Sequence, residues 1–106
     1  MDVYHSPEKF GLELIATVDH GVSYEFDIFA VWTDNNKDNN PDGQKVYYAT
    51  DSGCSCPSPF ENYDSMETLT RVSNLAYLRE NLKSWGADQT EIRNCLYAVT
   101  QKTGWL

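Results

Sequence analysis

The sequence has few basic residues, no long apolar run and only three cysteines. Lys and Arg together number 8 against 16 Asp and Glu, which gives a formal net charge of −8. A charge of this size and sign repels phosphate backbones, so we expect no direct binding to nucleic acid. No apolar stretch reaches the roughly 18 residues that a membrane-spanning helix requires, and we therefore expect no membrane insertion.

The beginning of the chain and its cysteine count indicate a compartment. Residues 1–9 contain no basic start followed by an apolar run, so we expect no signal peptide. An odd number of cysteines in a chain without an export signal is typical of a reducing environment. We therefore expect the protein in a cytoplasm.

Length and composition favour one folded domain. A chain of 106 residues fits a single domain, and 41% apolar with 13% aromatic residues is enough for one modest core. We divide residues 1–106 into an N-terminal arm, a β-meander, a Cys- and Pro-rich turn and a helical pair. Their respective ranges are 1–10, 11–50, 51–63 and 64–106.

Three segments in the first half alternate apolar and polar side chains as strands do. They cover residues 12–20, 23–33 and 45–50. In the first, the side chains expected to share one face are Leu12, Leu14, Ala16 and Val18. In the second, an unbroken apolar face consists of Tyr24, Phe26, Ile28, Ala30 and Trp32. The short connections favour an antiparallel meander.

The second half of the chain shows helical periodicity. Asp64 or Ser65 is placed to cap a first helix, whose apolar stripe continues to residue 85. A second start signal, Asp88 with Glu91, follows closely. The sequence thus predicts an α+β fold: a three-stranded antiparallel β-meander followed by an antiparallel helix pair packed on one face (βββαα). We expect the helices to cover the apolar face of the second strand.

The most unusual stretch is the run DSGCSCPSPFENY at residues 51–63. Its glycine and its two prolines indicate a rigid turn rather than a strand or a helix. Together with FGLE at 10–13 and YEFDIF at 24–29, the run resembles the signature of a family of small proteins from actinobacterial phages. The similarity covers roughly residues 10–80. The resemblance implies a setting only, namely a phage product made in the cytoplasm of a bacterial host.

The Cys54-x-Cys56 pair has three interpretations. Its thiols would supply two ligands of a zinc site, although paired zinc ligands are usually separated by two to four residues. They would also close a small, strained disulfide suited to thiol exchange. We favour the third, a structural turn, with Cys95 as a separate core thiol. The residues assigned to the turn are Asp51, Gly53, Cys54, Cys56, Pro57 and Phe60.

The polar loop at 34–43 matches part of a calcium-binding loop. Asp38, Asn40 and Asp42 place oxygen ligands on alternate residues, and a glycine follows where such a loop turns sharply. The position that needs a bidentate glutamate is occupied by Ala49. We therefore expect an ordinary hairpin loop and no cofactor, with Ca²⁺ at this loop and Zn²⁺ at the cysteine pair as the alternatives.

The sequence favours a binding role. It contains no pattern that assembles a nucleophile, a base and an oxyanion site, so we expect no enzyme. We predict a phage accessory protein that acts by binding a host or phage protein through an acidic, aromatic-bearing surface. The residues assigned to that surface are Glu25, Asp27, Tyr47 and Trp105. The alternative function is metal binding or thiol redox chemistry at the cysteine pair.

Overall fold

The computed structural model describes residues 2–22, 25–34, 45–54, 60, 63 and 65–104. Within these ranges the chain forms β-strands, α-helices and short 3₁₀ helices. In chain order the elements are η1 (Pro7–Phe10), β1 (Leu12–Asp19), β2 (Glu25–Asp34), β3 (Val46–Cys54), η3 (Met66–Thr68), β4 (Thr70–Val72), α1 (Leu75–Trp85) and α2 (Gln89–Thr103).

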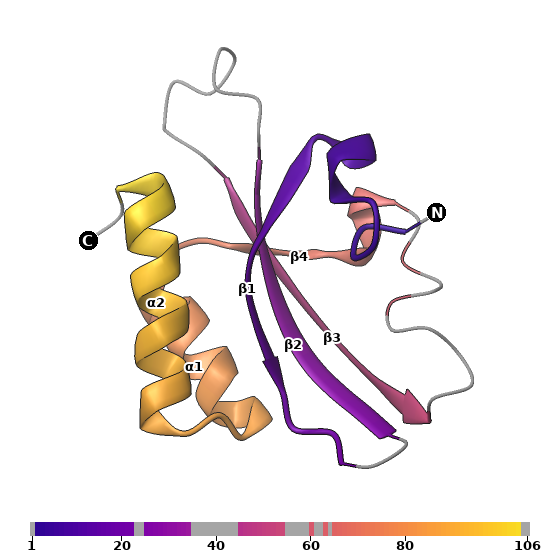
Figure 1. Ribbon diagram of the computed structural model, residues 1–106. Coiled ribbons are helices and arrows are strands. Elements are labelled where there is room, and N and C mark those ends of the chain that lie inside the picture. The colour runs from indigo at the N-terminus through magenta and orange to yellow at the C-terminus, as the bar shows by residue number, and fades with distance from the viewer. Residues whose placement is uncertain are drawn as a thin grey trace.

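The strands form one antiparallel sheet in the order β1-β2-β3-β4, which is also their order in the sequence. Helices α1 and α2 lie on one side of this sheet, and the N-terminal segment lies on the other (Figure 1). The predicted α+β class, the meander order and the helix pair on one face are confirmed. The predicted number of three strands is wrong, because β4 pairs with the beginning of β3 as a fourth.

Strand β4 lies where the sequence predicted the beginning of the first helix. Leu69 and Val72 are three residues apart, a spacing that suits one helix face but places side chains on opposite faces of a strand. Leu69 is buried on one side of the sheet and Val72 on the other. The helix instead begins at Leu75, where the Asn74 side chain accepts a backbone hydrogen bond at 2.8 Å. The predicted helical range 64–106 therefore begins too early.

Each face of the sheet carries its own buried cluster. The arm side is the face packed against the N-terminal segment, and its buried residues are Val3, Leu12, Phe26, Ile28, Ala30, Trp32, Ala49, Phe60 and Leu69. The helix side is the face covered by α1 and α2, and its buried residues are Val18, Phe29, Val31, Val46, Val72, Leu78, Leu82, Cys95 and Val99. The predicted cover of β2 is thus wrong. Both faces of this strand are apolar, and the helices pack on the face of Phe29 and Val31.

A β-bulge makes β1 contribute to both clusters. Leu14 is paired with Trp32, but the next paired residues are Ala16 and Val31, so the register shifts between Leu14 and Ala16. The extra residue reverses the alternation of side chains beyond it. Leu12 and Leu14 therefore pack on the arm side, whereas Ala16 and Val18 pack on the helix side. The prediction that these four share one face is wrong.

Strand β3 continues into the stretch predicted to be a turn. Residues Asp51–Cys54 pair with Glu25–Ile28 of β2, so Asp51, Gly53 and Cys54 belong to the sheet. Strand β2 supplies hydrogen-bond partners for the backbone of these residues. The glycine and cysteine residue types do not predict this pairing. Phe60 is fully buried on the arm side. Cys56 and Pro57 lie outside the described residues.

The helix termini and the core thiol agree with the sequence. Asp88 and Glu91 form a complete capping box at the start of α2, and Gly86 ends α1 with a φ of 112°. Cys95 is a free thiol that is 3% exposed, which confirms its assignment to the core. Burial raises its pKa to about 11, with a further contribution from the Glu91 carboxylate. The thiol is therefore protonated at neutral pH and is not a nucleophile there.

Candidate interaction surface on the helix pair

A groove of about 650 Å³ lies between α1 and α2. The helices are consecutive, joined by the three residues 86–88, and pack against each other on the helix side of the sheet. We call this depression the helix groove. Its lining residues are Arg79, Glu80, Lys83, Ala87, Asp88, Gln89, Ile92, Arg93 and Leu96. A groove of this size matches the volume of typical binding sites in proteins.

Helical spacing places these side chains beside the core. On α1, Leu78 and Leu82 are buried under the helix, and Arg79 and Lys83 each follow one of them by one residue. On α2, Leu96 likewise follows the buried Cys95. One residue advances the direction of a side chain by about 100° around a helix axis. The positions that follow the core positions therefore lie on the flank of each helix that borders the groove.

Basic side chains gather at the helix groove. Arg79, Lys83 and Arg93 line it, which is three of the eight Lys and Arg residues in the chain. Among the described residues none of the three forms an ion pair, whereas Lys102 pairs with Glu13 at 2.6 Å. The groove thus presents unpaired positive charge on a protein whose net charge is −8.

Three of the six other lining residues are apolar, and three, Glu80, Asp88 and Gln89, are polar or charged. Ala87, Ile92 and Leu96 are half-buried and supply apolar surface between the charged side chains. Tyr97 follows Arg93 by one helical turn and is 64% exposed. Tyrosine and arginine are enriched at protein interfaces, because they combine apolar area with a polar group.

The distribution of charge along the sequence is a signal for this surface, whereas motifs and spacing are not. Residues 1–63 carry 3 basic and 11 acidic side chains, whereas residues 64–106 carry 5 of each. The whole net negative charge therefore belongs to the first part of the chain. Residues 64–106 are neutral as a whole. Their basic side chains were not predicted to form a site, because they come together only when the two helices lie side by side.

The residues predicted to form an acidic, aromatic surface are divided between two faces. Glu25 is exposed and Asp27 half-buried, and both alternate with Phe26 and Ile28, so they lie on the helix side. Tyr47 is paired with Trp32 and packs against the arm-side cluster. Burial raises the pKa of the Tyr47 phenol, as does the Asp34 carboxylate. Trp105 lies outside the described residues.

The predicted metal alternatives fall largely outside the described residues. Asp38, Asn40 and Asp42 lie there, as does Cys56, and the calcium and zinc alternatives therefore stay predictions. Cys54 ends strand β3. In the described ranges, no group of three or more His, Cys, Asp or Glu side chains is arranged to hold a metal ion.

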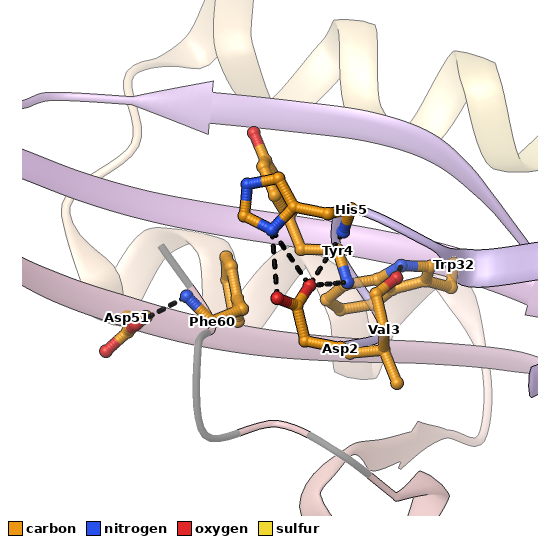
Figure 2. Close-up of polar contacts among 7 residues, drawn as sticks. All are labelled: Asp2, Val3, Tyr4, His5, Trp32, Asp51 and Phe60. Carbon is orange, nitrogen blue, oxygen red and sulfur yellow. Dashed lines mark hydrogen bonds and ion pairs between the residues drawn. The ribbon is translucent and has the colours of Figure 1, made fainter. Parts of the chain in front are cut away.

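The N-terminal segment is tied to the arm side by a polar clasp, which we define as residues 2–5 (Figure 2). Asp2 is 7% exposed, and its Oδ1 accepts hydrogen bonds from the backbone N–H groups of Tyr4 at 2.9 Å and His5 at 2.7 Å. Its Oδ2 lies 2.9 Å from His5 Nδ1. The Trp32 indole donates to the Val3 carbonyl oxygen at 2.9 Å. The clasp thus anchors the segment that was predicted from the sequence as an N-terminal arm.

The clasp makes the stability of the protein dependent on the charge of Asp2. Burial alone raises the pKa of this carboxyl group, but the hydrogen bonds from His5 and Tyr4 and the His5 imidazole outweigh it and lower the pKa. A group with a lowered folded-state pKa stabilises the protein above its unfolded pKa and loses that contribution as the pH falls through the folded pKa. For Asp2 this loss begins below about pH 4.

We expect Asp2→Asn to lower the free energy of unfolding at pH 7 by about 1–3 kcal/mol, because a neutral amide is a weaker acceptor in this buried position. Urea denaturation at pH 7, 5 and 3 measures the effect. The difference between the variant and the parent protein should shrink at pH 3, because Asp2 of the unfolded chain is then largely protonated and the contribution of the charge begins to be lost. A difference that stays constant over this range would contradict the role given to the Asp2 charge.

Fold and groove together define a small α+β domain with a candidate binding surface. The chain belongs to a family described as a domain of unknown function (DUF7574), whose model matches residues 1–102. No curated protein and no solved structure is found to match the chain. In the part of the chain that the structure describes, no helix has the length and apolar character needed to cross a membrane.

Proposed function

We propose that the protein acts non-enzymatically by binding a protein partner, and that the helix groove holds this partner. The observation that carries the proposal is the combination of a groove of about 650 Å³, a half-buried apolar lining and unpaired basic side chains at its borders. Apolar area supplies affinity when it is covered, and charged side chains at the border supply specificity.

The groove supports this function better than the acidic surface predicted from the sequence. Glu25 and Asp27 lie on the other face of the sheet from Tyr47, so one partner segment does not reach all three. Tyr97 on α2 supplies the exposed aromatic side chain that the binding role requires. The proposal therefore keeps the predicted class of function and moves its location to the helix pair.

We also propose the setting that the resemblance implies. The run at residues 51–63 and the segments at 10–13 and 24–29 support an origin in a phage of actinobacteria. In that setting the protein is made in the cytoplasm of the host, and its partner is a host or phage protein. Binding at the helix groove is proposed from its lining residues and does not require this origin.

A photo-crosslinking experiment tests the location. The crosslinking amino acid p-benzoylphenylalanine replaces Tyr97 beside the groove in one variant, and the exposed Glu8 of η1 on the arm side in a matched control. Each purified variant is mixed with actinobacterial lysate and irradiated. We expect one discrete adduct from position 97 and none from position 8.

A second variant makes the result specific to the groove. Leu96→Asn removes apolar lining at a half-buried position, so the fold should persist, which circular dichroism verifies. The adduct from position 97 should then fall at least about tenfold, equivalent to a loss of 1.4 kcal/mol of binding free energy. Equal crosslinking from positions 97 and 8, or an adduct that Leu96→Asn does not weaken, would show that the groove is not the binding surface.

A further inference from the structure

We infer that the segment held in the helix groove is an acidic amphipathic α-helix, an inference that rests on the proposed function. Two features of the groove carry it. Its walls are the two helices α1 and α2, and the charged side chains that line it are three basic against two acidic. The first feature selects the conformation of the partner segment, and the second selects its charge.

The helical walls favour a helical occupant. The backbone N–H and C=O groups inside α1 and α2 are bonded within each helix, so they offer no partners to an extended peptide. An extended segment in this groove would bury unpaired backbone groups, each at a cost of about 1–3 kcal/mol. A helix satisfies its own backbone and lays an apolar stripe into a groove between helices. Ile92 and Leu96, one turn apart on α2, supply the apolar surface for such a stripe.

The charges at the groove favour an acidic occupant. Arg79 and Lys83 are one turn apart on α1, and Arg93 stands on α2 across the groove. Two carboxylates also line it. Asp88 accepts a hydrogen bond from the Glu91 backbone N–H at 2.8 Å as the cap of α2, which leaves Glu80 as the carboxylate without such a role. The balance of the available charges is positive, so carboxylates flanking the apolar stripe of the partner would be attracted.

The negative net charge of the protein does not oppose this inference at short range. The acidic excess belongs to residues 1–63, whereas the part that forms the groove is neutral. At physiological ionic strength the field of a charge is screened over about 8 Å. A helix lying in the groove therefore interacts mainly with the charges that line it, three basic side chains against the carboxylates of Glu80 and Asp88.

Designed peptides of about 18 residues test the inference directly. The acidic peptide carries leucines at positions i, i+3, i+4 and i+7 with glutamates on both flanks of the stripe. A basic peptide replaces each glutamate by lysine, and a third peptide keeps the glutamates but carries two central prolines that prevent a helix. Binding is measured by fluorescence anisotropy. We expect the acidic helix to bind at least about tenfold more tightly than the basic peptide, as three weak ion pairs would supply, and at least about tenfold more tightly than the proline peptide, which does not form the helix.

Variants of the protein identify the charges responsible. The triple change Arg79→Gln, Lys83→Gln and Arg93→Gln should weaken the acidic peptide about tenfold. A matched control, Lys9→Gln, Lys45→Gln and Arg71→Gln, alters the net charge equally at positions outside the groove and should leave binding within about twofold. Equal effects of the two triples, a preference for the basic peptide, or binding of the proline peptide as tightly as the helix would each overturn the inference.

The outcome separates this inference from the proposed function. If Leu96→Asn abolishes the crosslinked adduct while the Arg79, Lys83 and Arg93 triple leaves it unchanged, the groove binds a protein but not through acidic side chains. If neither change affects the adduct, the groove is not the site. Binding of vesicles that contain phosphatidylglycerol, with no preference for the acidic peptide, would also overturn the inference, since an anionic surface would then be the occupant.

Discussion

Phe60→Ala is expected to lower the free energy of unfolding by about 3–5 kcal/mol, the range for truncating a fully buried aromatic side chain. Phe60 is 0% exposed, and its ring stacks with Tyr4 at 4.9 Å between centroids. It also meets Trp32 and Tyr63 edge to face at 5.6 and 4.9 Å. The ring thus joins the N-terminal segment, the sheet and the chain after β3 in one cluster. Its removal leaves a cavity that three elements border.

The backbone conformation of Phe60 allows a second prediction at the same position. Its φ is +60°, which makes it the one non-glycine residue with positive φ in the described ranges. The Phe60 N–H donates to Asp51 Oδ2 at 2.8 Å, which fixes this conformation (Figure 2). Left-handed backbone costs alanine roughly 1 kcal/mol but costs glycine almost nothing. Phe60→Gly should therefore be less destabilising than Phe60→Ala, a reversal of the usual order.

Urea denaturation of both variants, followed by circular dichroism, measures the two effects. Tyr97→Ala is the control, because Tyr97 is 64% exposed and its truncation should change the free energy of unfolding by less than about 0.5 kcal/mol. If Phe60→Ala costs no more than this control, Phe60 is not the centre of the arm-side core. If alanine is tolerated better than glycine, the left-handed backbone at Phe60 is not what the chain adopts.

The sequence predicted the class of fold well where one local rule acted alone. The capping box of Asp88 and Glu91 and the αL position of Gly86 depend on a few neighbouring residues, and both are found as expected. Strand β2 was predicted from an apolar side chain at every second residue of 24–32, and its assignment as a strand is likewise confirmed. Such features need no knowledge of the rest of the chain.

The failures arose where one pattern fits two structures. A spacing of three residues between Leu69 and Val72 suits a helix with one apolar face, but it suits equally a bend and a short strand that bury one side chain on each side of the sheet. The bulge after Leu14 is another case, because the same order of apolar residues in the sequence fits both a regular strand and a strand with one inserted residue. Neighbouring strands decide between the readings, and a single sequence does not contain their register.

The candidate site shows the same limit. The cations of α1 and α2 are visible in the sequence, but their convergence depends on which flank each helix turns toward the other. That orientation is set by the buried residues beneath, such as Leu82 on α1 and Val99 on α2, which pack against the helix side of the sheet. The surface predicted from the sequence relied on strands instead, where Glu25 and Tyr47 proved to lie on opposite faces.

Phe29→Ala should cause the second large loss, again about 3–5 kcal/mol, through the core on the helix side. Phe29 is 0% exposed, its ring stacks with Tyr48 at 5.0 Å between centroids, and it meets Trp85 edge to face at 5.6 Å. Trp85 belongs to α1, so Phe29 links this helix to the sheet. Hydrogen exchange should show the amides of α1 losing protection before those of β2, because the helix loses a docking contact while the strand keeps its pairing.

The two phenylalanines together test whether the sheet separates two cores. Phe29 and Phe60 lie on opposite faces and share no ring partner among the described contacts, so milder changes at the two sites should act independently. The free energies lost in Phe29→Leu and Phe60→Leu should add in the double variant to within about 0.5 kcal/mol. A coupling above about 1 kcal/mol would contradict the separation, since residues in one core share neighbours that relax together. Additivity would also mean that the helix pair, with its groove, is held by the helix-side core and is not affected by changes in the arm-side core.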